Sequence, residues 1–404
     1  MKKTKLGSIL FICLLSCFTT KASDFSIRFE QESPQLRQVA KLIEQRLPLK
    51  VKKVIDGPVV IQFSTLNSED KYTPLCHLPK SGLYPEDLIR GQTSDWQHGD
   101  TFNIEIDQSF QKILEKKESD SQNYSCGHKN YYRLALGTII HQVGALFEIK
   151  AKEKHIKRLS ENKIFLQIAG WKKNIVGQYK YKNKTAVRVS DPLEIKNVST
   201  FFNVNFEYFL LDEEFRLRRP LIFKMYEEYF DRTEKEIENK KQALPSTVVY
   251  LHSTNLSQNL KRRVDIDPKR IYSIHYLFAS KGESSMSRWG HAMLRLIVCA
   301  PYRKAVGPEC LYDTDYHVSV GFRANVNDLI INYAKGLMGG YPSTLYMFSM
   351  RETIEEYPVS ELRDLISLPL KLSPEQKDVL IYSLAETYWA YGGKYYFITN
   401  NCAV

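Results

Sequence analysis

The pattern of apolar residues changes once along this chain, near Pro245, and that change constrains the possible folds more than any other feature. Before it, helical spacing at residues 34–47, 131–147 and 221–240 alternates with strand-like runs at 59–63 and 102–106. After it come strand-like runs at 248–252, 271–279, 291–298 and 316–321, helical stretches at 326–337 and 375–391, and a closing strand at 394–398. This mixture predicts an α+β protein with two domains, joined by a linker at residues 241–246.

The N-terminus has the composition of an export signal. Lys2, Lys3 and Lys5 precede an apolar run at residues 9–18, which is too short to span a bilayer, and residues 20–22 offer a small-residue cleavage site. We therefore expect a signal peptide at residues 1–22 and a periplasmic or cell-envelope location. A loose lipobox at residues 14–17 leaves lipoprotein anchoring at Cys17 as an alternative.

Export implies an oxidising compartment, in which cysteines tend to form disulfides. Cleavage of the signal leaves Cys76, Cys126, Cys299, Cys310 and Cys402. Cys299 and Cys310 flank a loop that contains Pro and Gly and are a plausible pair, and Cys76 with Cys126 is the other. Cys402 is then the unpaired thiol.

The formal net charge is +11, and much of it lies in the Lys-rich stretch at residues 150–184. Such a stretch is typical of a solvated basic face, and it also suits contact with an anionic membrane or envelope polymer. Nucleic acid is not an expected partner, because binding it needs basic residues interleaved with stacking aromatics and because export argues against it.

A histidine and a cysteine stand where two strands are expected to begin and end. His291 opens the alternating run at residues 291–298, and Asn401-Cys402 follows the closing strand. A base beside a thiol favours its thiolate, which is the pairing of papain-like enzymes with the chain order reversed. The alternatives are a satisfied histidine at a strand end and an inert core cysteine.

Three segments together resemble the Lnb N-terminal periplasmic domain family. They are Trp289-Gly-His291-Ala-Met-Leu-Arg295, then Asn332-Tyr-Ala-Lys-Gly336-Leu-Met-Gly339-Gly340-Tyr-Pro342, and finally Tyr395-Tyr-Phe-Ile-Thr-Asn-Asn-Cys402-Ala. The resemblance covers residues 271–404. It implies a circularly permuted papain-like fold, similar to NlpC-type and lecithin:retinol acyltransferase-like thiol enzymes.

By that resemblance, Cys402 is the nucleophile and His291 is the general base. A third residue should orient the imidazole; we expect His317 on the next predicted strand, with Ser319 as the runner-up. The resemblance also implies that the backbone N–H of Cys402 helps to stabilise an oxyanion, with Asn401 shaping the turn.

Gly336, Gly339, Gly340 and Pro342 are expected to shape a loop in the thiol domain, either as turn residues or near substrate. The family pattern continues into a helix after the cysteine, whereas this sequence ends two residues later. We therefore expect an incomplete domain, either a fragment, a frameshifted product or one half of a split protein.

The helical stretch of the first domain contains a degenerate metal-binding motif. Thr138-Ile-Ile-His141-Gln-Val-Gly-Ala145 is similar to the His-Glu-x-x-His signature of zinc peptidases, but Gln142 replaces the glutamate and Ala145 the second histidine. Residues 169–171 and 203–210 resemble downstream segments of such domains and place Glu207 as a third ligand. We expect a degenerate zincin-like domain without metal; a coincidental buried histidine is the alternative.

The sequence thus predicts a zincin-like α/β domain at residues 24–245 and a permuted papain-like thiol domain at 246–404. The expected function is a hydrolase or acyltransferase acting on a lipoprotein or lipid acyl group or on a peptidoglycan peptide, with no cofactor. The alternative is a catalytically inactive envelope-binding or scaffold protein with two vestigial sites.

Overall fold

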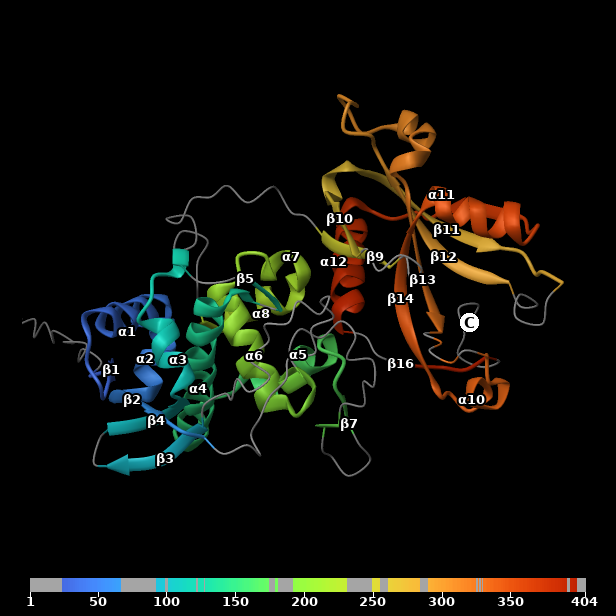
Figure 1. The fold of residues 1–404 in the computed structure, drawn as a ribbon. Coiled ribbons are helices and arrows are strands. Elements are labelled where there is room, and N and C mark those ends of the chain that lie inside the picture. The colour runs from blue at the N-terminus through green and yellow to red at the C-terminus, as the bar shows by residue number, and fades with distance from the viewer. Residues whose placement is uncertain are drawn as a thin grey trace, which may run out of the picture.

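The computed structural model describes residues 24–66, 92–98, 101–120, 123–126, 128–173, 179–180, 192–230, 249–254, 261–283, 290–324, 326, 328, 330–390 and 393–397. Apolar side chains gather in one large cluster drawn from residues 27–230 and in smaller clusters drawn from residues 266–388. We call these parts the first body and the second body; Figure 1 shows them in blue to green and in yellow to red.

The first body contains a four-stranded mixed sheet with the strand order β1-β2-β4-β3. Strands β1 and β4 are parallel to β2, and β3 is antiparallel to β4. The strands span Ser26–Phe29 (β1), Pro58–Ser64 (β2), Gln92–His98 (β3) and Thr101–Asp107 (β4). Two short hairpins pair Asn123–Cys126 (β5) with His128–Asn130 (β6) and Lys172–Lys173 (β7) with Tyr179–Lys180 (β8).

Helices pack around this sheet and against each other. They span Pro34–Arg46 (α1), Leu49–Ile55 (α2), Ser109–Leu114 (α3), Tyr131–Glu153 (α4), Lys163–Ile168 (α5), Val198–Leu211 (α6), Phe215–Arg218 (α7) and Pro220–Phe230 (α8), with 3-10 turns at Glu118–Asp120 (η2), Leu159–Glu161 (η3) and Pro192–Ile195 (η4). Helix α1 begins where predicted, because Ser33 accepts the Leu36 N–H and Pro34 suits the first turn.

Helix α4 is the central helix of the first body. It is long and apolar enough, at a mean hydropathy of 1.2, to suit a membrane span by composition alone, yet 89% of that window is buried inside the protein. Gly137 and Gly144 allow α6 to approach closely, since a Cβ at Gly144 would lie 3.1 Å from the Phe206 ring and 3.2 Å from Asn203.

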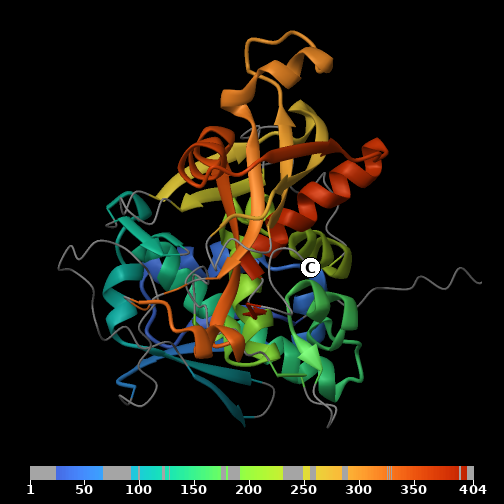
Figure 2. The same cartoon turned by 90° about the vertical axis from the view of Figure 1, so that its right-hand side faces the viewer.

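The second body contains a six-stranded antiparallel sheet with the order β15-β11-β12-β13-β14-β16. Its strands span Ile271–Ala279 (β11), His291–Val298 (β12), Val318–Ala324 (β13), Tyr341–Ser349 (β14), Leu365–Pro369 (β15) and Gly393–Tyr395 (β16). A hairpin of Val249–Thr254 (β9) and Lys261–Ile266 (β10) precedes it. Figures 1 and 2 show this sheet beside the first body.

Helical segments cover the two faces of the second sheet. They are Pro268–Arg270 (η5), Pro308–Tyr312 (η6), Thr314–Tyr316 (η7), Tyr333–Leu337 (α10), Met350–Ile354 (α11), the π-helical turn Glu355–Ser360 (η8) and Pro374–Ala390 (α12). Leu296 and Val320 face α12, whereas Met293 faces Met350 and Tyr357. Strand alternation therefore divides β12 between two different environments.

A buried ion network joins the two bodies. Arg219, between α7 and α8, donates through Nη1 to Glu194 of η4 at 2.6 Å and through Nε to Glu386 of α12. All three side chains are almost inaccessible to solvent. We call these three residues the Arg219 network; it fixes α12 against the first body.

The structure confirms the α+β class and the predicted strands at residues 271–279 and 291–298. The helix predicted at residues 326–337 is wrong in its first half. Asn332 accepts the N–H of Lys335 and caps the helix, so α10 begins only at Tyr333. The predicted linker at residues 241–246 lies outside the described residues.

Candidate active site

His291 is the first residue of β12 and lies against the turn η8. Its imidazole stacks on the Tyr357 ring, with 5.7 Å between ring centroids, and only 7% of the residue is exposed. Gly321 of the neighbouring strand β13 leaves space for it, since a Cβ there would come within 3.3 Å of His291 Nε2. The imidazole is therefore held in one position by its neighbours.

Two arginines surround this histidine with positive charge. Burial, followed by the charges of Arg323 and Arg363, lowers the pKa of His291 to about 3. Arg323 donates to Glu356 at 2.7 Å and to the Tyr357 hydroxyl at 2.9 Å, and the Arg363 guanidinium lies 4.9 Å from the Tyr357 ring centre. At neutral pH the imidazole is uncharged and can accept a proton.

His291 Nε2 is fully buried and has no hydrogen-bond partner in the part of the chain that the structure describes. The hydroxyl of Thr344 on β14 is unsatisfied in the same way, and Thr344 pairs in register with Arg323. Buried polar atoms without partners are rare, and they concentrate at sites that bind or react.

Strand β16 lies at the end of the sheet where β12 begins. β16 pairs with the start of β14, with Tyr395 opposite Tyr341 and Gly393 opposite Ser343. Ser343 in turn pairs with Ala324 of β13, one residue from Arg323. Cys402 and Asn401 lie outside the described residues, so their predicted roles remain predictions.

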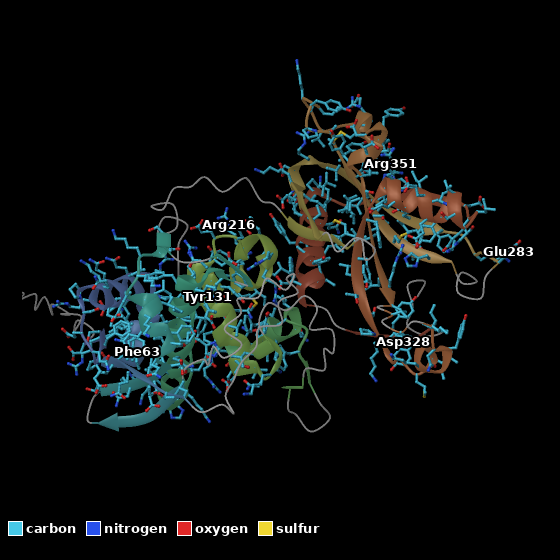
Figure 3. All side chains as sticks on the ribbon, in the orientation of Figure 1. Phe63, Tyr131, Arg216, Glu283, Asp328 and Arg351 are labelled. Carbon is cyan, nitrogen blue, oxygen red and sulfur yellow. A yellow bond between two sulfur atoms is a disulfide. The ribbon has the colours of Figure 1, made fainter. Side chains whose placement is uncertain are left out.

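The four residues expected to shape a loop lie in a glycine segment at the entry to β14, but only two of them, Gly339 and Gly340, lie between elements; Gly336 lies in α10 and Pro342 in β14. A Cβ at Gly336 would lie 2.2 Å from the Phe397 ring, and a Cβ at Gly339, whose φ is +68°, would lie 2.4 Å from the Tyr396 ring. Asp328 holds the segment by accepting from Lys335 at 2.9 Å and from the Tyr341 hydroxyl at 2.7 Å; Figure 3 labels this carboxylate. Gly340 packs on Lys335, and Pro342 pairs with Lys394 of β16.

The structure does not bring His317 to His291. His317 precedes β13, whose Val318 pairs with Leu296, so it lies near the far end of β12, roughly 17–20 Å from His291 by strand rise. Both of its ring nitrogens are engaged, by Arg295 at 2.7 Å and by the Cys310 carbonyl at 2.8 Å. The runner-up Ser319 pairs with Arg295, and its hydroxyl lies 2.5 Å from that of Thr353.

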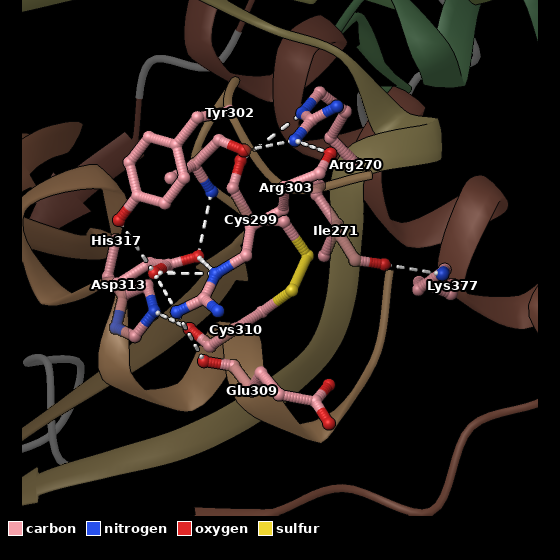
Figure 4. Close-up of a disulfide and its surroundings, with 11 residues drawn as sticks. Arg270, Ile271, Cys299, Tyr302, Arg303, Glu309, Cys310, Asp313, His317 and Lys377 are labelled. Atoms are coloured by element: carbon pink, nitrogen blue, oxygen red, sulfur yellow. Dashed lines mark hydrogen bonds and ion pairs between the residues drawn. A yellow bond between two sulfur atoms is a disulfide. The ribbon is translucent and has the colours of Figure 1, made fainter. Parts of the chain in front are cut away.

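Cys299 and Cys310 form the predicted disulfide. It closes a lobe of residues 299–317 that stands out from the sheet (Figures 1 and 4). Inside the lobe, Asp313 accepts from Arg303 at 2.7 Å and from the Ala300 N–H at 2.9 Å, and the Arg303 hydrogen bond is the main cause that lowers the pKa of Asp313 to about 2. The side chains of the other suggested pair, Cys76 and Cys126, lie outside the described residues.

In the first body, His141 of α4 and Glu207 of α6 are brought together as predicted. His141 Nδ1 lies 2.6 Å from Glu207 Oε1, and His128, at the start of β6, places Nε2 3.1 Å from Glu207 Oε2. All three side chains are buried, and a Cβ at Gly137 would lie within 2.9 Å of both His128 and Glu207. The carboxylate therefore bridges two imidazoles.

This cluster lacks the arrangement of a metal centre. Gln142 is buried and Ala145 is half-buried, at the two motif positions where a zinc peptidase would carry its glutamate and second histidine. Among the described residues, no group of three or more His, Cys, Asp or Glu side chains is placed to hold a metal ion.

Sequence reasoning missed several of these contacts. His128 stands three residues before α4, and the metal-site motif in the sequence did not include it. Arg323, Tyr357 and Arg363 reach His291 from β13, from η8 and from the segment before β15. Those contacts depend on the strand order of the sheet, which alternation alone does not reveal.

Family models match two parts of the chain. Residues 223–404 match the Lnb N-terminal periplasmic domain, and residues 142–239 match a domain of unknown function, DUF7844. No curated protein and no solved structure matches the chain. The first match points to a periplasmic, envelope-located protein, and neither match confirms a zincin-like domain.

Proposed function

Because residues 223–404 match the Lnb N-terminal periplasmic domain, we propose that the second body is a cysteine-dependent hydrolase or acyltransferase of the cell envelope. Cys402 is the nucleophile and His291 the general base. The observation that carries this proposal is the buried, uncharged imidazole of His291, whose Nε2 has no partner among the described residues. Such a nitrogen is ready to accept the proton of a thiol.

The chain is long enough to bring the two residues together. Cys402 lies seven positions after Tyr395, the last residue of β16, which permits a span of roughly 23 Å. Three strand spacings of about 4.8 Å separate β16 from β12 across the sheet. The available chain therefore exceeds the distance to be covered.

The proposed chemistry is acyl transfer through a thioester. The Sγ of Cys402 attacks the carbonyl carbon of an amide or ester while its proton passes to His291 Nε2. The leaving amine or alcohol departs with the bonding electron pair and takes that proton. Water or an acceptor amine then attacks the thioester, gives up a proton to His291, and releases the thiol. Lipid or lipoprotein acyl groups and peptidoglycan peptides are the proposed substrates.

The test is formation of the acyl-enzyme on the full mature chain. With p-nitrophenyl octanoate as the probe, intact mass should rise by one octanoyl group, and Cys402→Ala should abolish this. His291→Gln should slow acylation about 10²- to 10⁴-fold. His155→Gln, at an exposed histidine of the first body, is the matched control and should react normally.

Acylation that survives Cys402→Ala, or that is unchanged in His291→Gln, would refute the assigned pair. A folded chain that forms no adduct with the octanoyl ester or with a peptide thioester probe would instead favour the inactive envelope-binding protein.

The first body is proposed as a degenerate zincin-like scaffold of residues 24–245 that presents a basic face. Its exposed lysines include Lys152, Lys154, Lys157 and Lys163, whereas Lys150 is buried and pairs with Glu153. Peripheral contact with anionic envelope surfaces would use these charges. Vesicle binding that persists after all four are replaced by glutamine would contradict this contact.

A further inference from the structure

A second polar cluster lies on the same face of β12 as His291, four residues further along the strand. Arg295 is its centre: Nη2 lies 2.7 Å from His317 Nδ1, and Nη1 lies 3.4 Å from Ser367 Oγ on β15. His275 of β11 places Nδ1 3.0 Å from the same Ser367 hydroxyl and Nε2 3.1 Å from Ser273. We call these five residues the Arg295 cluster.

The hydrogen bonds of His317 fix it as a neutral group. His317 Nε2 lies 2.8 Å from the Cys310 carbonyl, which can only accept, so Nε2 carries the hydrogen and Nδ1 accepts from Arg295 (Figure 4 shows His317 beside Cys310). Burial lowers the pKa of His317, and burial followed by the Arg295 charge lowers that of His275. Arg295 is therefore the only full charge among the five.

Among the described residues, this charge has no counter-charge. Arg295 is half-buried, and no Asp or Glu lies within ion-pair distance of it in the described part of the chain. The carboxylate of the adjoining lobe, Asp313, is engaged by Arg303. Two more deeply buried arginines do have carboxylate partners. Arg219 contacts two carboxylates, and Arg363 contacts Glu361 at 2.6 Å.

A guanidinium withdrawn from water without an anion is energetically unfavourable. The hydrogen bonds to His317 and Ser367 offset part of that cost, but two neutral imidazoles and two hydroxyls supply no negative charge. Arginine also forms paired hydrogen bonds to planar or tetrahedral oxyanions. The missing component of the cluster is thus an anion.

We propose that the Arg295 cluster is a binding site for a phosphate-class oxyanion. Three of the five N–H groups of a guanidinium are used by His317 and Ser367, which leaves two to donate to the ligand. The Ser367 hydroxyl, on the edge strand β15, is placed to add a third donor. The bound anion lies roughly 13 Å from His291 along β12, so the site is separate from the thiol chemistry and does not depend on it.

The ligand is either free phosphate or the phosphate of a lipid headgroup, and two arms separate these sources. Inorganic phosphate is titrated into the full mature chain by calorimetry, and phosphatidate in phosphatidylcholine vesicles is tested by co-flotation. Binding in the first arm alone identifies a soluble anion, and binding in the second alone identifies a headgroup. Binding in both arms means that the site accepts free phosphate as well as a phosphate headgroup.

Arg295→Gln should weaken whichever binding is seen at least tenfold. Arg351→Gln is the matched control, because that arginine is 76% exposed and lies on α11, and it should bind as the unaltered chain does. No binding in either arm, or equal binding by Arg295→Gln, would overturn the proposal.

If Arg295→Gln does not fold, the proposal is tested on the unaltered chain by chemical labelling of its arginines. Phenylglyoxal labels accessible arginines, and the labelled positions are read by peptide mass spectrometry. Phosphate, but not chloride at equal ionic strength, should slow labelling of Arg295 severalfold and leave Arg351 unaffected. Equal labelling rates at Arg295 in both salts would show that no phosphate occupies the cluster.

Discussion

At the scale of single residues, burial and the charges around His291 decide when it can take up a proton. Burial first, and then the charges of Arg323 and Arg363, lower the pKa of His291 and make an imidazolium unfavourable, so a resting ion pair with a thiolate is not expected. The same cations favour negative charge nearby. Proton transfer to His291 is therefore expected only as negative charge develops on the attacked carbonyl oxygen.

His291 should also make the protein sensitive to acid. The unfolded imidazole binds a proton below about pH 6.5, whereas the folded one does so only below about pH 3. Between these values the unfolded state binds more protons, so the free energy of unfolding rises with pH across this window, by at most about 1.4 kcal/mol per pH unit. His291→Gln should remove this slope in urea denaturation measured from pH 4 to pH 7.

The control is His155→Gln, which should keep the slope because His155 is exposed. An unchanged pH dependence in His291→Gln would mean that the imidazole is not held neutral in the folded protein.

His317 illustrates which information at the residue scale the sequence lacks. Alternation correctly identified the strand His291–Val298 and a following strand, but the pairing register between them was unspecified. The connection is the long disulfide-closed lobe, and it sets Leu296 rather than His291 near His317. The presence of the disulfide was predictable from the sequence, whereas its effect on register was not.

At the scale of elements, α10 and the glycine segment position the chain that leads to Cys402. Phe397 rests on Gly336 and stacks on Tyr341, with 5.9 Å between ring centroids, and its N–H donates to the Gly336 carbonyl at 3.2 Å. The predicted loop is correct for Gly339 and Gly340 and wrong for Gly336, which lies in α10; each of the three leaves room for a neighbouring side chain, of Tyr396, Lys335 and Phe397 respectively.

Gly336→Ala should displace Phe397, because the added methyl would lie 2.2–2.5 Å from its ring atoms. The rate of iodoacetamide labelling of Cys402 at pH 7 should change severalfold, while the acid sensitivity due to His291 persists. Gly307→Ala is the matched control, since the methyl there meets only the flexible Glu309 carboxylate. Equal effects of the two changes would argue against the positioning role.

Strand β14 shows why some elements escaped prediction. Pro342 was expected to shape a loop, but it is the second residue of β14. Proline is confined mostly to the ends and edges of sheets, and in the described part of the chain the pairing of β14 with β13 ends at Ser343, so Pro342 pairs with Lys394 of the three-residue strand β16. The exception is visible only once the strand order is known.

At the scale of the whole molecule, the Arg219 network determines how the two bodies depend on each other. Glu194 and Glu386 are both buried and bind different nitrogens of one guanidinium, and Glu386 also accepts the Ile222 N–H at 3.5 Å. The change of apolar pattern near Pro245 predicted two domains. The contact between Arg219 and Glu386 was not predictable, because residues 167 positions apart leave no periodic signal in the sequence.

Arg219→Ala should leave two buried carboxylates unpaired and lower the free energy of unfolding by about 3–5 kcal/mol. Chemical denaturation followed by tryptophan fluorescence and by far-ultraviolet circular dichroism measures this loss. Lys224→Ala, which removes an exposed pair with Glu228, is the control and should cost less than about 1 kcal/mol. A loss for Arg219→Ala as small as that of the control would disprove the coupling.

This network also restricts how the protein can be divided. A recombinant fragment cut near Pro245 would carry α12 with Glu386 and an apolar surface formerly packed on α8, but without the arginine that neutralises the carboxylate. The same restriction applies to gene fusion and domain exchange, because a second body moved onto another protein would need a replacement for Arg219. We therefore expect the two bodies to be inherited, exported and purified together.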